Sequence, residues 1–289
     1  MIKNMLSTAC IGLAAAGCLV CLSGCGKEKV HSGGEYETDE VSAVYMEADT
    51  WDIHMNVSSD DKIQVSFKGD VSKGEPQPEV QLQGGVLQVV QERGKETLGD
   101  KIALGKKGEI TVCLPEKYRL PIEIHNGSGD IQMDRVEAVD FQLENDSGYA
   151  VLSEVTAEQA QVTSHSGDIT WEGGDIADIS MNMVAGYGVI KKTVFQRVEA
   201  EAESGEINIS GAQADTDIRI QTESGDISLG YETEPENLEF DIAAKSKDLS
   251  VGLAGASYSK ETEGKRQGVI GEGKYGLEIV SDSGTVVVK

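Results

Sequence analysis

The pattern of apolar and polar positions after about residue 120 repeats with a fixed period. A glycine, usually preceded by serine, recurs along the chain and is followed by alternating polar and apolar residues. The glycines are Gly129, Gly148, Gly167, Gly186, Gly205 and Gly225, at steps of 19, 19, 19, 19 and 20 residues. A period this regular indicates a stacked repeat architecture.

Four positions of each repeat stay apolar when the copies are aligned on this glycine. In the third copy they are Ala160, Val162, Ile169 and Trp171. Since the residues between them are mostly polar, each repeat predicts two short strands that turn one side inward. We expect the Ser-Gly pair to turn the chain between them, because glycine tolerates positive φ and allows close stacking. The predicted fold class is all-β, a single-stranded β-solenoid (β-helix) of about 19-residue rungs.

The solenoid is predicted to cover residues 120–289, with an irregularity near its end. A seventh rung lies near residues 240–251, where Lys247 takes the glycine position, and an eighth lies near 277–288. Between them, residues 252–276 form a Gly-rich insert. An insert of this length without structure of its own is usually functional or mobile.

Residues 40–119 alternate without the period and predict an irregular β region rich in hairpins. Apolar residues alternate over 51–57 and 63–67, on either side of the polar stretch 58–61, which predicts one hairpin. Gly84-Gly85 predicts a second hairpin with a tight turn of positive φ. Most of 91–108 is charged and Gly-punctuated, which is typical of a loop.

The N-terminal segment has an apolar run from Met5 to Leu22 that ends in Leu22-Ser23-Gly24-Cys25. This resembles a bacterial lipoprotein signal peptide. The resemblance implies a signal peptide over 1–24, cleavage before Cys25 and lipidation of the Cys25 thiol. It also implies a location at the extracytoplasmic face of the cell membrane. The polar residues 25–39 are then the lipidated cysteine and a flexible tether. The alternative is an uncleaved transmembrane anchor, since the run is about long enough to span a bilayer.

Charge and cysteine content narrow the classes of function. The chain has 25 Lys and Arg against 50 Asp and Glu, a formal net charge of −25. Nucleic acid is therefore excluded as a partner, because its binding depends on cationic side chains. Of the five cysteines, only Cys113 lies within the predicted fold, so no internal disulfide is expected. Its strand-like setting favours a packed residue over a nucleophile.

Stacking would align the residue that follows each glycine into one ladder. Its members are Asp130, Tyr149, Asp168, Tyr187, Glu206 and Asp226. The alternation of acid and tyrosine separates like charges over the first four rungs. It ends at Glu206, Asp226 and Asp248, three acids in succession that form a candidate Ca²⁺ site, because Ca²⁺ takes six to eight oxygen ligands. The alternative is that these acids are solvated and fan apart.

No residue pattern supports catalysis. The four histidines are scattered, and Ser257 and Lys260 match Ser-x-x-Lys without its partner motifs. A polysaccharide-active β-helix needs grouped acids beside sugar-stacking aromatics. The outward positions three after each glycine are small and mixed, and Trp171 falls on the inward side. We therefore predict no catalytic residue, no cofactor and no enzymatic activity.

The repeated Ser-Gly-Asp/Glu-Ile rungs, together with the strand ending at Leu114-Pro115, resemble the DUF4097 family over roughly residues 45–289. The family is described as candidate adhesins and is related to bacterial envelope-stress accessory proteins. The resemblance implies a β-solenoid at the cell surface with no established enzyme activity.

The expected function is a lipid-anchored binding or structural module of the bacterial envelope. Its expected partners are the membrane through Cys25, and a cell-wall, host-surface or membrane-protein partner. One alternative is an envelope-stress accessory or sensor lipoprotein that acts through a membrane protein. A lower alternative is a polysaccharide-active enzyme.

Overall fold

The computed structural model describes residues 27–72, 76–92 and 108–289. The chain divides into two compact units, 1–143 and 144–289. The first rung of the repeat, near residues 122–133, belongs to the first unit. The predicted signal peptide and Cys25 lie outside the described residues. Within the described ranges there is no helix that could cross a membrane.

The first unit is built from two sheets. One has the strand order β1-β4-β7-β3-β9 and the other has the order β5-β6-β2-β8. The strands are β1 (Lys27–Glu37), β2 (Ala43–Ala48), β3 (Asp52–Ser58), β4 (Lys62–Ser72), β5 (Glu79–Gln83), β6 (Val86–Gln91), β7 (Gly108–Pro115), β8 (Leu120–Asn126) and β9 (Ile131–Asp134). The chain passes into the second unit within β10 (Ala138–Asn145).

One predicted hairpin of this unit is confirmed and the other is wrong. β5 and β6 pair antiparallel across Gly84-Gly85, whose φ values are 59° and 82°. β3 and β4, in contrast, are not neighbours, because β7 lies between them. Val112 of β7 is paired with Val65 of β4 on one side and Met55 of β3 on the other. Inserting β7 thus places a third row of apolar side chains in the same buried layer.

The predicted flexible tether is also wrong over residues 27–37. These residues form β1, which pairs antiparallel with β4 along its full length. The pairing is made by main-chain groups and covers the edge of the sheet, so it needs no apolar periodicity. Gly33 is part of this contact, because a Cβ there would collide with the Val65 carbonyl oxygen.

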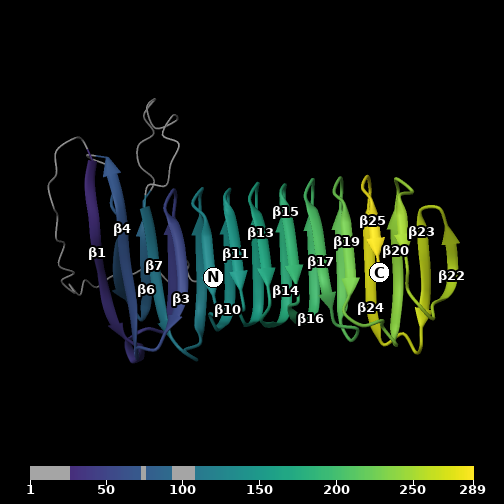
Figure 1. Ribbon diagram of the computed structural model, residues 1–289, viewed down its shortest axis with the longest axis horizontal. Helices are drawn as coiled ribbons and strands as arrows, with labels where there is room; N and C mark the ends of the chain where they lie inside the picture. The colour runs from purple at the N-terminus through teal and green to yellow at the C-terminus, as the bar shows by residue number, and fades with distance from the viewer. Residues whose placement is uncertain (1–26, 73–75, 93–107) are drawn as a thin grey trace. The chain divides into compact units, whose positions relative to one another are not determined.

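The second unit is a β-solenoid, as the period predicts. Each rung contributes one strand to each of two sheets, and successive rungs pair in parallel (Figure 1). The sheet orders are β11-β13-β15-β17-β19-β25-β21 and β12-β14-β16-β18-β24-β20-β23-β22. The strands are β11 (Tyr149–Ser153), β12 (Ala157–Ser164), β13 (Asp168–Glu172), β14 (Asp175–Met183), β15 (Tyr187–Lys191), β16 (Val194–Ala202), β17 (Glu206–Ala212), β18 (Asp217–Thr222), β19 (Ile227–Tyr231), β20 (Leu238–Ala244), β21 (Leu249–Val251), β22 (Ser257–Thr262), β23 (Lys265–Ile270), β24 (Tyr275–Ser281) and β25 (Val286–Val288).

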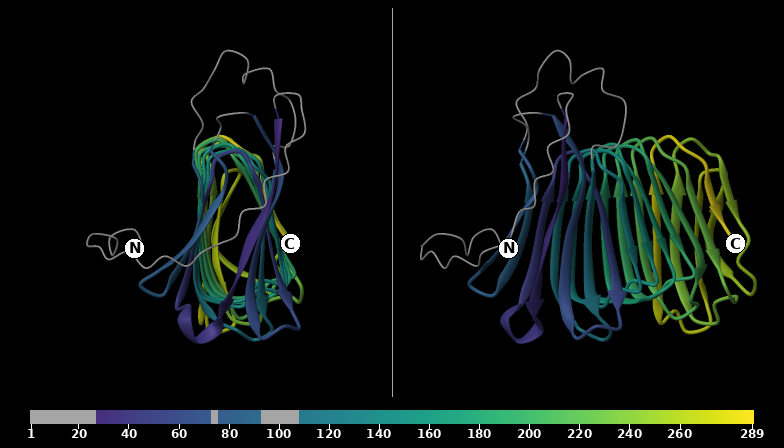
Figure 2. Two further views of the ribbon diagram at one scale, coloured as in Figure 1. Left: turned by 90° about the vertical axis from the view of Figure 1, so that its left-hand side faces the viewer. Right: turned by 60° about the vertical axis from the view of Figure 1, so that its left-hand side comes forward.

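The predicted inward positions form the core of this unit. Viewed along the stacking direction, its rungs overlie one another with the core between the two sheets (Figure 2). Ala160, Val162, Ile169 and Trp171 are all buried, as are the corresponding residues of the other rungs except Leu249 and Val251 of the seventh, which are half-buried. The ladder of apolar side chains is therefore confirmed.

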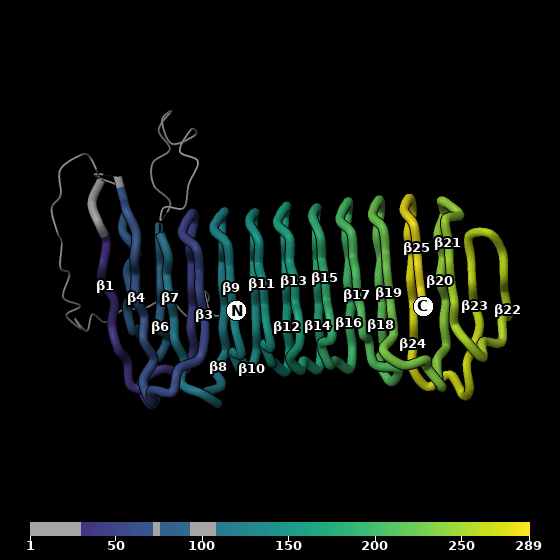
Figure 3. Tube along the Cα trace, in the orientation of Figure 1, coloured from purple at the N-terminus to yellow at the C-terminus, as the bar shows by residue number. Residues whose placement is uncertain are grey.

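The last rungs are stacked in a different order from the sequence. β24 and β25, which end the chain, lie between the sixth rung (β18 and β19) and the seventh (β20 and β21) (Figure 3). Much of the insert predicted as a loop over 252–276 forms the hairpin β22–β23, and β23 pairs antiparallel with β20. The hairpin covers an edge of β20 that would otherwise expose unpaired main-chain groups.

Candidate functional site

The corners between the two strands of a rung are held by buried polar side chains. Ser164, three residues before its glycine, donates its hydroxyl to the Gly167 carbonyl at 2.8 Å and accepts the Gly167 N–H at 3.1 Å. Thr222 donates to the Gly225 carbonyl at 2.9 Å, and Asn145 donates to the Gly148 carbonyl at 3.1 Å. The turn is thus stabilised from inside the core, where water cannot reach it.

The serine of each Ser-Gly pair links its rung to the preceding one. Ser166 donates its hydroxyl to the Asp146 carbonyl at 3.0 Å, and Ser204 donates to the Val184 carbonyl at 3.0 Å. The glycine itself is required mainly by close stacking. A Cβ at Gly205 would lie 2.8 Å from the Gly186 carbonyl oxygen, and one at Gly225 would collide with the Gly205 carbonyl oxygen.

The acids that follow some glycines have a structural role. Asp168 Oδ1 accepts the main-chain N–H of Tyr187 in the next rung at 2.9 Å. Asp226 Oδ1 accepts the N–H of Thr285 at 2.7 Å in the same way. Each carboxylate therefore fixes the main chain where the strand stacked on it begins, a role beyond the charge spacing that the sequence suggested.

The candidate Ca²⁺ site is not assembled. Glu206 begins β17 and Asp226 directly precedes the adjacent strand β19, but β25 separates β19 from β21, which Asp248 directly precedes, so Asp248 is not next to Asp226. The rung order assumed from the sequence was wrong, which is why the three acids do not meet. Within the described ranges no three His, Cys, Asp or Glu side chains form a group that could hold a metal ion.

The remaining candidates from the sequence stay apart. His54, His125 and His165 each lie near a different acid, Glu109, Glu123 and Asp146 respectively. Burial, with a smaller contribution from the charge of Asp60, raises the pKa of the Cys113 thiol. Cys113 is therefore protonated at neutral pH, which disfavours nucleophilic chemistry. Ser257 and Lys260 lie on the exposed hairpin strand β22.

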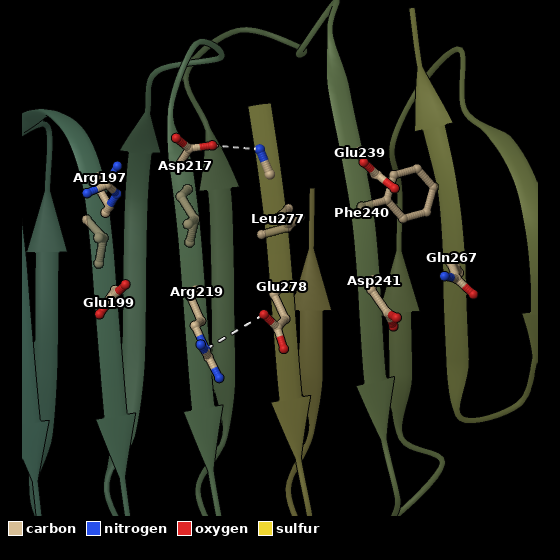
Figure 4. A pocket seen from close by; sticks show the side chains of 13 residues that line it. Arg197, Glu199, Asp217, Arg219, Glu239, Phe240, Asp241, Gln267, Leu277 and Glu278 are labelled. Carbon is tan, nitrogen blue, oxygen red and sulfur yellow. Dashed lines mark hydrogen bonds and ion pairs between the residues drawn. The ribbon is translucent and has the colours of Figure 1, made fainter. Parts of the chain in front are cut away.

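A hollow of about 430 Å³ lies on the outer face of β16, β18, β24 and β20 (Figure 4). Gly276 of β24 is paired with Glu239 of β20 and donates its N–H to Asp217 Oδ1 of β18 at 2.8 Å, so the missing side chain of Gly276 opens the hollow. Its polar lining includes Arg197, Glu199, Asp217, Arg219, Glu239, Asp241, Gln267 and Glu278.

Some of the charges of this hollow are paired within the protein. Arg219 Nε lies 3.7 Å from Glu278 Oε2, and Arg197 pairs with Asp178 at 3.4 Å. Lys265, from the hairpin, pairs with Asp241 at 2.8 Å. Glu199 and Glu239 form no ion pair among the described residues, and Asp217 accepts the N–H of Gly276 at 2.8 Å. The hollow is therefore partly paired and keeps a net negative charge.

The second unit also exposes an apolar face, which we call the tyrosine face. It comprises Tyr149 and Val151 of β11, Asp168 and Thr170 of β13, and Tyr187 and Val189 of β15, with Val184 at the adjoining corner. The tyrosines are 63% and 52% exposed, and Val151 and Val184 are each 40% exposed. Exposed aromatic side chains grouped on a regular scaffold mark an interaction surface.

The register of the three strands sets the geometry of this face. Tyr149 is paired with Asp168, whose carboxylate holds Tyr187, so the tyrosines lie two strands apart. Given the usual strand spacing, their main chains are separated by about 9.6 Å. Thr170 lies between Val151 and Val189. On this face, β13 with its two polar side chains therefore lies between β11 and β15, each of which presents a tyrosine and a valine.

The fourth rung, which supplies Tyr187, departs from the pattern of the other corners. Met183 and Ala185 replace the buried hydrogen-bonding residue and the corner serine, so neither side-chain hydrogen bond can form there. Gly188 replaces the apolar residue of the core, and a Cβ on it would lie 2.6 Å from Met183 Sδ and 2.7 Å from Met181 Sδ. The methionines therefore fill the space that Gly188 leaves.

Sequence reasoning named Tyr149 and Tyr187 but assigned them only a role in spacing charges. The pairing register was needed to place them on one exposed face with Val151 and Val184. The detectable signal was the sequence Met183 to Gly186, in which both corner residues are replaced at once by apolar ones.

These observations define an all-β solenoid of 19-residue rungs that exposes apolar side chains on one outer face. The chain belongs to the Toastrack DUF4097 family, whose model matches residues 41–289. No protein with a curated description matches it.

One solved structure supports the fold. The chain is similar to a candidate adhesin from Bacteroides fragilis NCTC 9343, at 16% identity and a TM-score of 0.51, over 89% of this chain and 96% of that one. A candidate lipid-binding protein from Parabacteroides distasonis ATCC 8503 matches at 15% identity and a TM-score of 0.46, over 90% and 96% of the two chains. At such identities the likeness concerns the fold alone. The Bacteroides fragilis protein carries an adhesin description, which is said of that protein.

Proposed function

We propose that this protein is a binding module of the bacterial cell surface, anchored by lipid on Cys25 and engaging its partner through the tyrosine face. The observation that supports this most directly is the exposure of Tyr149 and Tyr187 beside Val151. Leaving these side chains in water gains nothing for folding, whereas covering them with a partner removes apolar area from water.

The rest of the unit supports a binding role over catalysis. Asp168 and Asp226 direct a carboxylate oxygen to a main-chain N–H of the neighbouring rung, and Glu278 and Asp241 of the hollow are paired with Arg219 and Lys265. In this proposal, the hydrogen bonds between rungs hold the outer surface in a fixed shape. No covalent step is required of any residue.

The test is capture of envelope material by the full-length protein in mild detergent. Purified cell-wall sacculi, host matrix proteins and a membrane extract are offered separately to the wild type and to the double variant Tyr149→Ser/Tyr187→Ser. We expect specific capture that the double variant loses. A Tyr258→Ser variant serves as the control, since Tyr258 is 38% exposed but lies on β22, outside the tyrosine face.

The outcomes separate the candidate roles. Capture of sacculi or of a matrix protein through the tyrosine face supports an adhesive or structural role. Capture of one membrane protein alone supports the sensor role in the envelope. Equal capture by the wild type and the double variant, or no capture of any material, contradicts binding through this face.

A further inference from the structure

Building on the proposed surface-binding function, we propose that the tyrosine face binds a neutral, extended β-1,4-linked glycan whose chain runs along the stacking direction. Tyr149 and Tyr187 would each stack on one face of a sugar ring, and Asp168 and Thr170 between them would hydrogen-bond the sugar hydroxyls. Val151 and Val189, two residues after the tyrosines on β11 and β15, would contact one edge of the bound glycan.

The spacing of the two rings supports an extended chain. The tyrosines are two strands apart, about 9.6 Å along the stack. In an extended β-1,4-linked glycan, alternate sugars present the same face at a similar repeat. Sugar n would therefore lie over Tyr149 and sugar n+2 over Tyr187, with the sugar between them crossing β13. A curved α-1,4-linked chain does not keep two faces in line over this distance.

The chemistry of the middle strand supports a polyhydroxylated ligand. Asp168 uses Oδ1 to hold the N–H of Tyr187, and its Oδ2 receives no hydrogen bond from the described residues. The Thr170 hydroxyl likewise has no partner among them, and both residues are partly exposed. A carboxylate oxygen and a hydroxyl between two aromatic rings match the alternation of hydroxyl edges and C–H faces in a sugar chain.

Charge argues for a neutral ligand. The chain carries a formal net charge of −25, and Glu206 pairs with Tyr187 on the far side from Asp168. Glycans with carboxylate or phosphate groups would be repelled by this surface. The face is also an open sheet surface and not a closed pocket, which fits a polymer that passes over it.

The experiment measures binding of oligosaccharides to the full-length protein by isothermal titration calorimetry. The probes are N-acetylglucosamine oligomers of two, three and four units, cellotetraose, maltotetraose and a tetrauronate. We expect the trimer and tetramer to bind at least about tenfold more tightly than the dimer, because only they reach both rings. Maltotetraose and the tetrauronate should show no comparable binding.

Variants separate stacking from other contacts. Tyr187→Ser should remove the gain from dimer to trimer, lowering the affinity for the trimer about tenfold, whereas Tyr187→Phe should retain it. Both side chains are exposed, so neither change should lower the melting temperature. Tyr258→Ser, outside the face, should leave the affinity unchanged.

The failure of this inference can be distinguished from failure of the proposed function. No saturable binding of any neutral β-linked oligomer overturns the glycan inference, as does equal binding by Tyr187→Ser or tighter binding of the tetrauronate. If the double variant still loses envelope capture in that case, the surface-binding function stands with a different partner. If capture also fails, both proposals are wrong.

Discussion

The corner hydrogen bonds of the second unit offer a direct test of what stabilises the stack. We predict that Ser164→Ala destabilises the protein clearly more than Ser166→Ala, although both remove one hydroxyl from the same corner. Ser164 is 0% exposed and makes two hydrogen bonds to Gly167. Ser166 is exposed and makes one, to the Asp146 carbonyl.

The size of the difference follows from burial. A typical hydrogen bond contributes about 0.5–1.5 kcal/mol, so losing two costs about 1–3 kcal/mol. No large cavity adds to this, because only an oxygen atom is removed. At Ser166, water can replace the hydroxyl, and an exposed substitution of this kind changes the free energy of unfolding by about 0.5 kcal/mol or less.

The assay is urea unfolding followed by circular dichroism, with thermal unfolding in parallel. For a unit of about 150 residues, each kcal/mol corresponds to roughly 2–4 °C in melting temperature. Ser164→Ala should therefore melt about 2–12 °C below the wild type, with an unchanged denaturant slope.

The fifth rung provides the reverse experiment. Its corner carries Ala202, 5% exposed, where the third rung has Ser164. Ala202→Ser should restore a donor to the Gly205 carbonyl and raise stability by about 0.5–1.5 kcal/mol. Equal midpoints for Ser164→Ala and Ser166→Ala, or a loss of stability in Ala202→Ser, would show that these buried hydroxyls do not hold the corners.

Three further predictions concern other parts of the chain. Gly225→Ala should lower the free energy of unfolding by about 1–3 kcal/mol, because its Cβ would collide with the Gly205 carbonyl. Gly230→Ala is the control, since its Cβ meets only Lys289 Cε at 3.8 Å, and it should be neutral or stabilising in thermal unfolding. Cys25→Ser should release the protein from membranes or leave the precursor uncleaved in cell fractionation, and unchanged retention at mature size would contradict lipidation. Burial raises the pKa of Tyr231, whose hydroxyl has no hydrogen-bond partner among the described residues. Tyr231→Phe should therefore keep or raise the melting temperature. A drop of several degrees would refute this.

The inner ladder was predictable because burial repeats with the strand. Ile169 and Trp171 must both face inward if the chain alternates, whatever their neighbours are. The order of the last rungs was not predictable in this way. A parallel ladder is made by main-chain groups, and Ile218 and Ile220 pack as well against Leu277 and Ile279 as they would against the seventh rung. Periodicity therefore specifies what a rung is, and not which rung lies beside it.

The same limit explains the errors at β1 and at the acids. β1 is held to β4 by main-chain pairing, so its polar composition gave no strand signal. The acids Asp226 and Asp248 were predicted to be neighbours only through the assumed rung order, which the insertion of β25 changes. The position of each acid within its rung followed from the sequence, but which acids lie side by side depends on the order in which the rungs stack.

The fourth rung connects the architecture to the proposed function. Met183 and Ala185 cannot make the two side-chain hydrogen bonds of the corner. By the estimate for Ser164, the buried position at Met183 alone loses about 1–3 kcal/mol of stability. Sites where a sequence breaks its own structural rule are often functional ones. Here the compensation is visible, because Asp168 of the third rung holds the N–H of Tyr187 at 2.9 Å. The backbone of Tyr187 is therefore fixed by its neighbour, which leaves the corner free to carry the exposed Val184 while the ring of Tyr187 keeps its place on the tyrosine face.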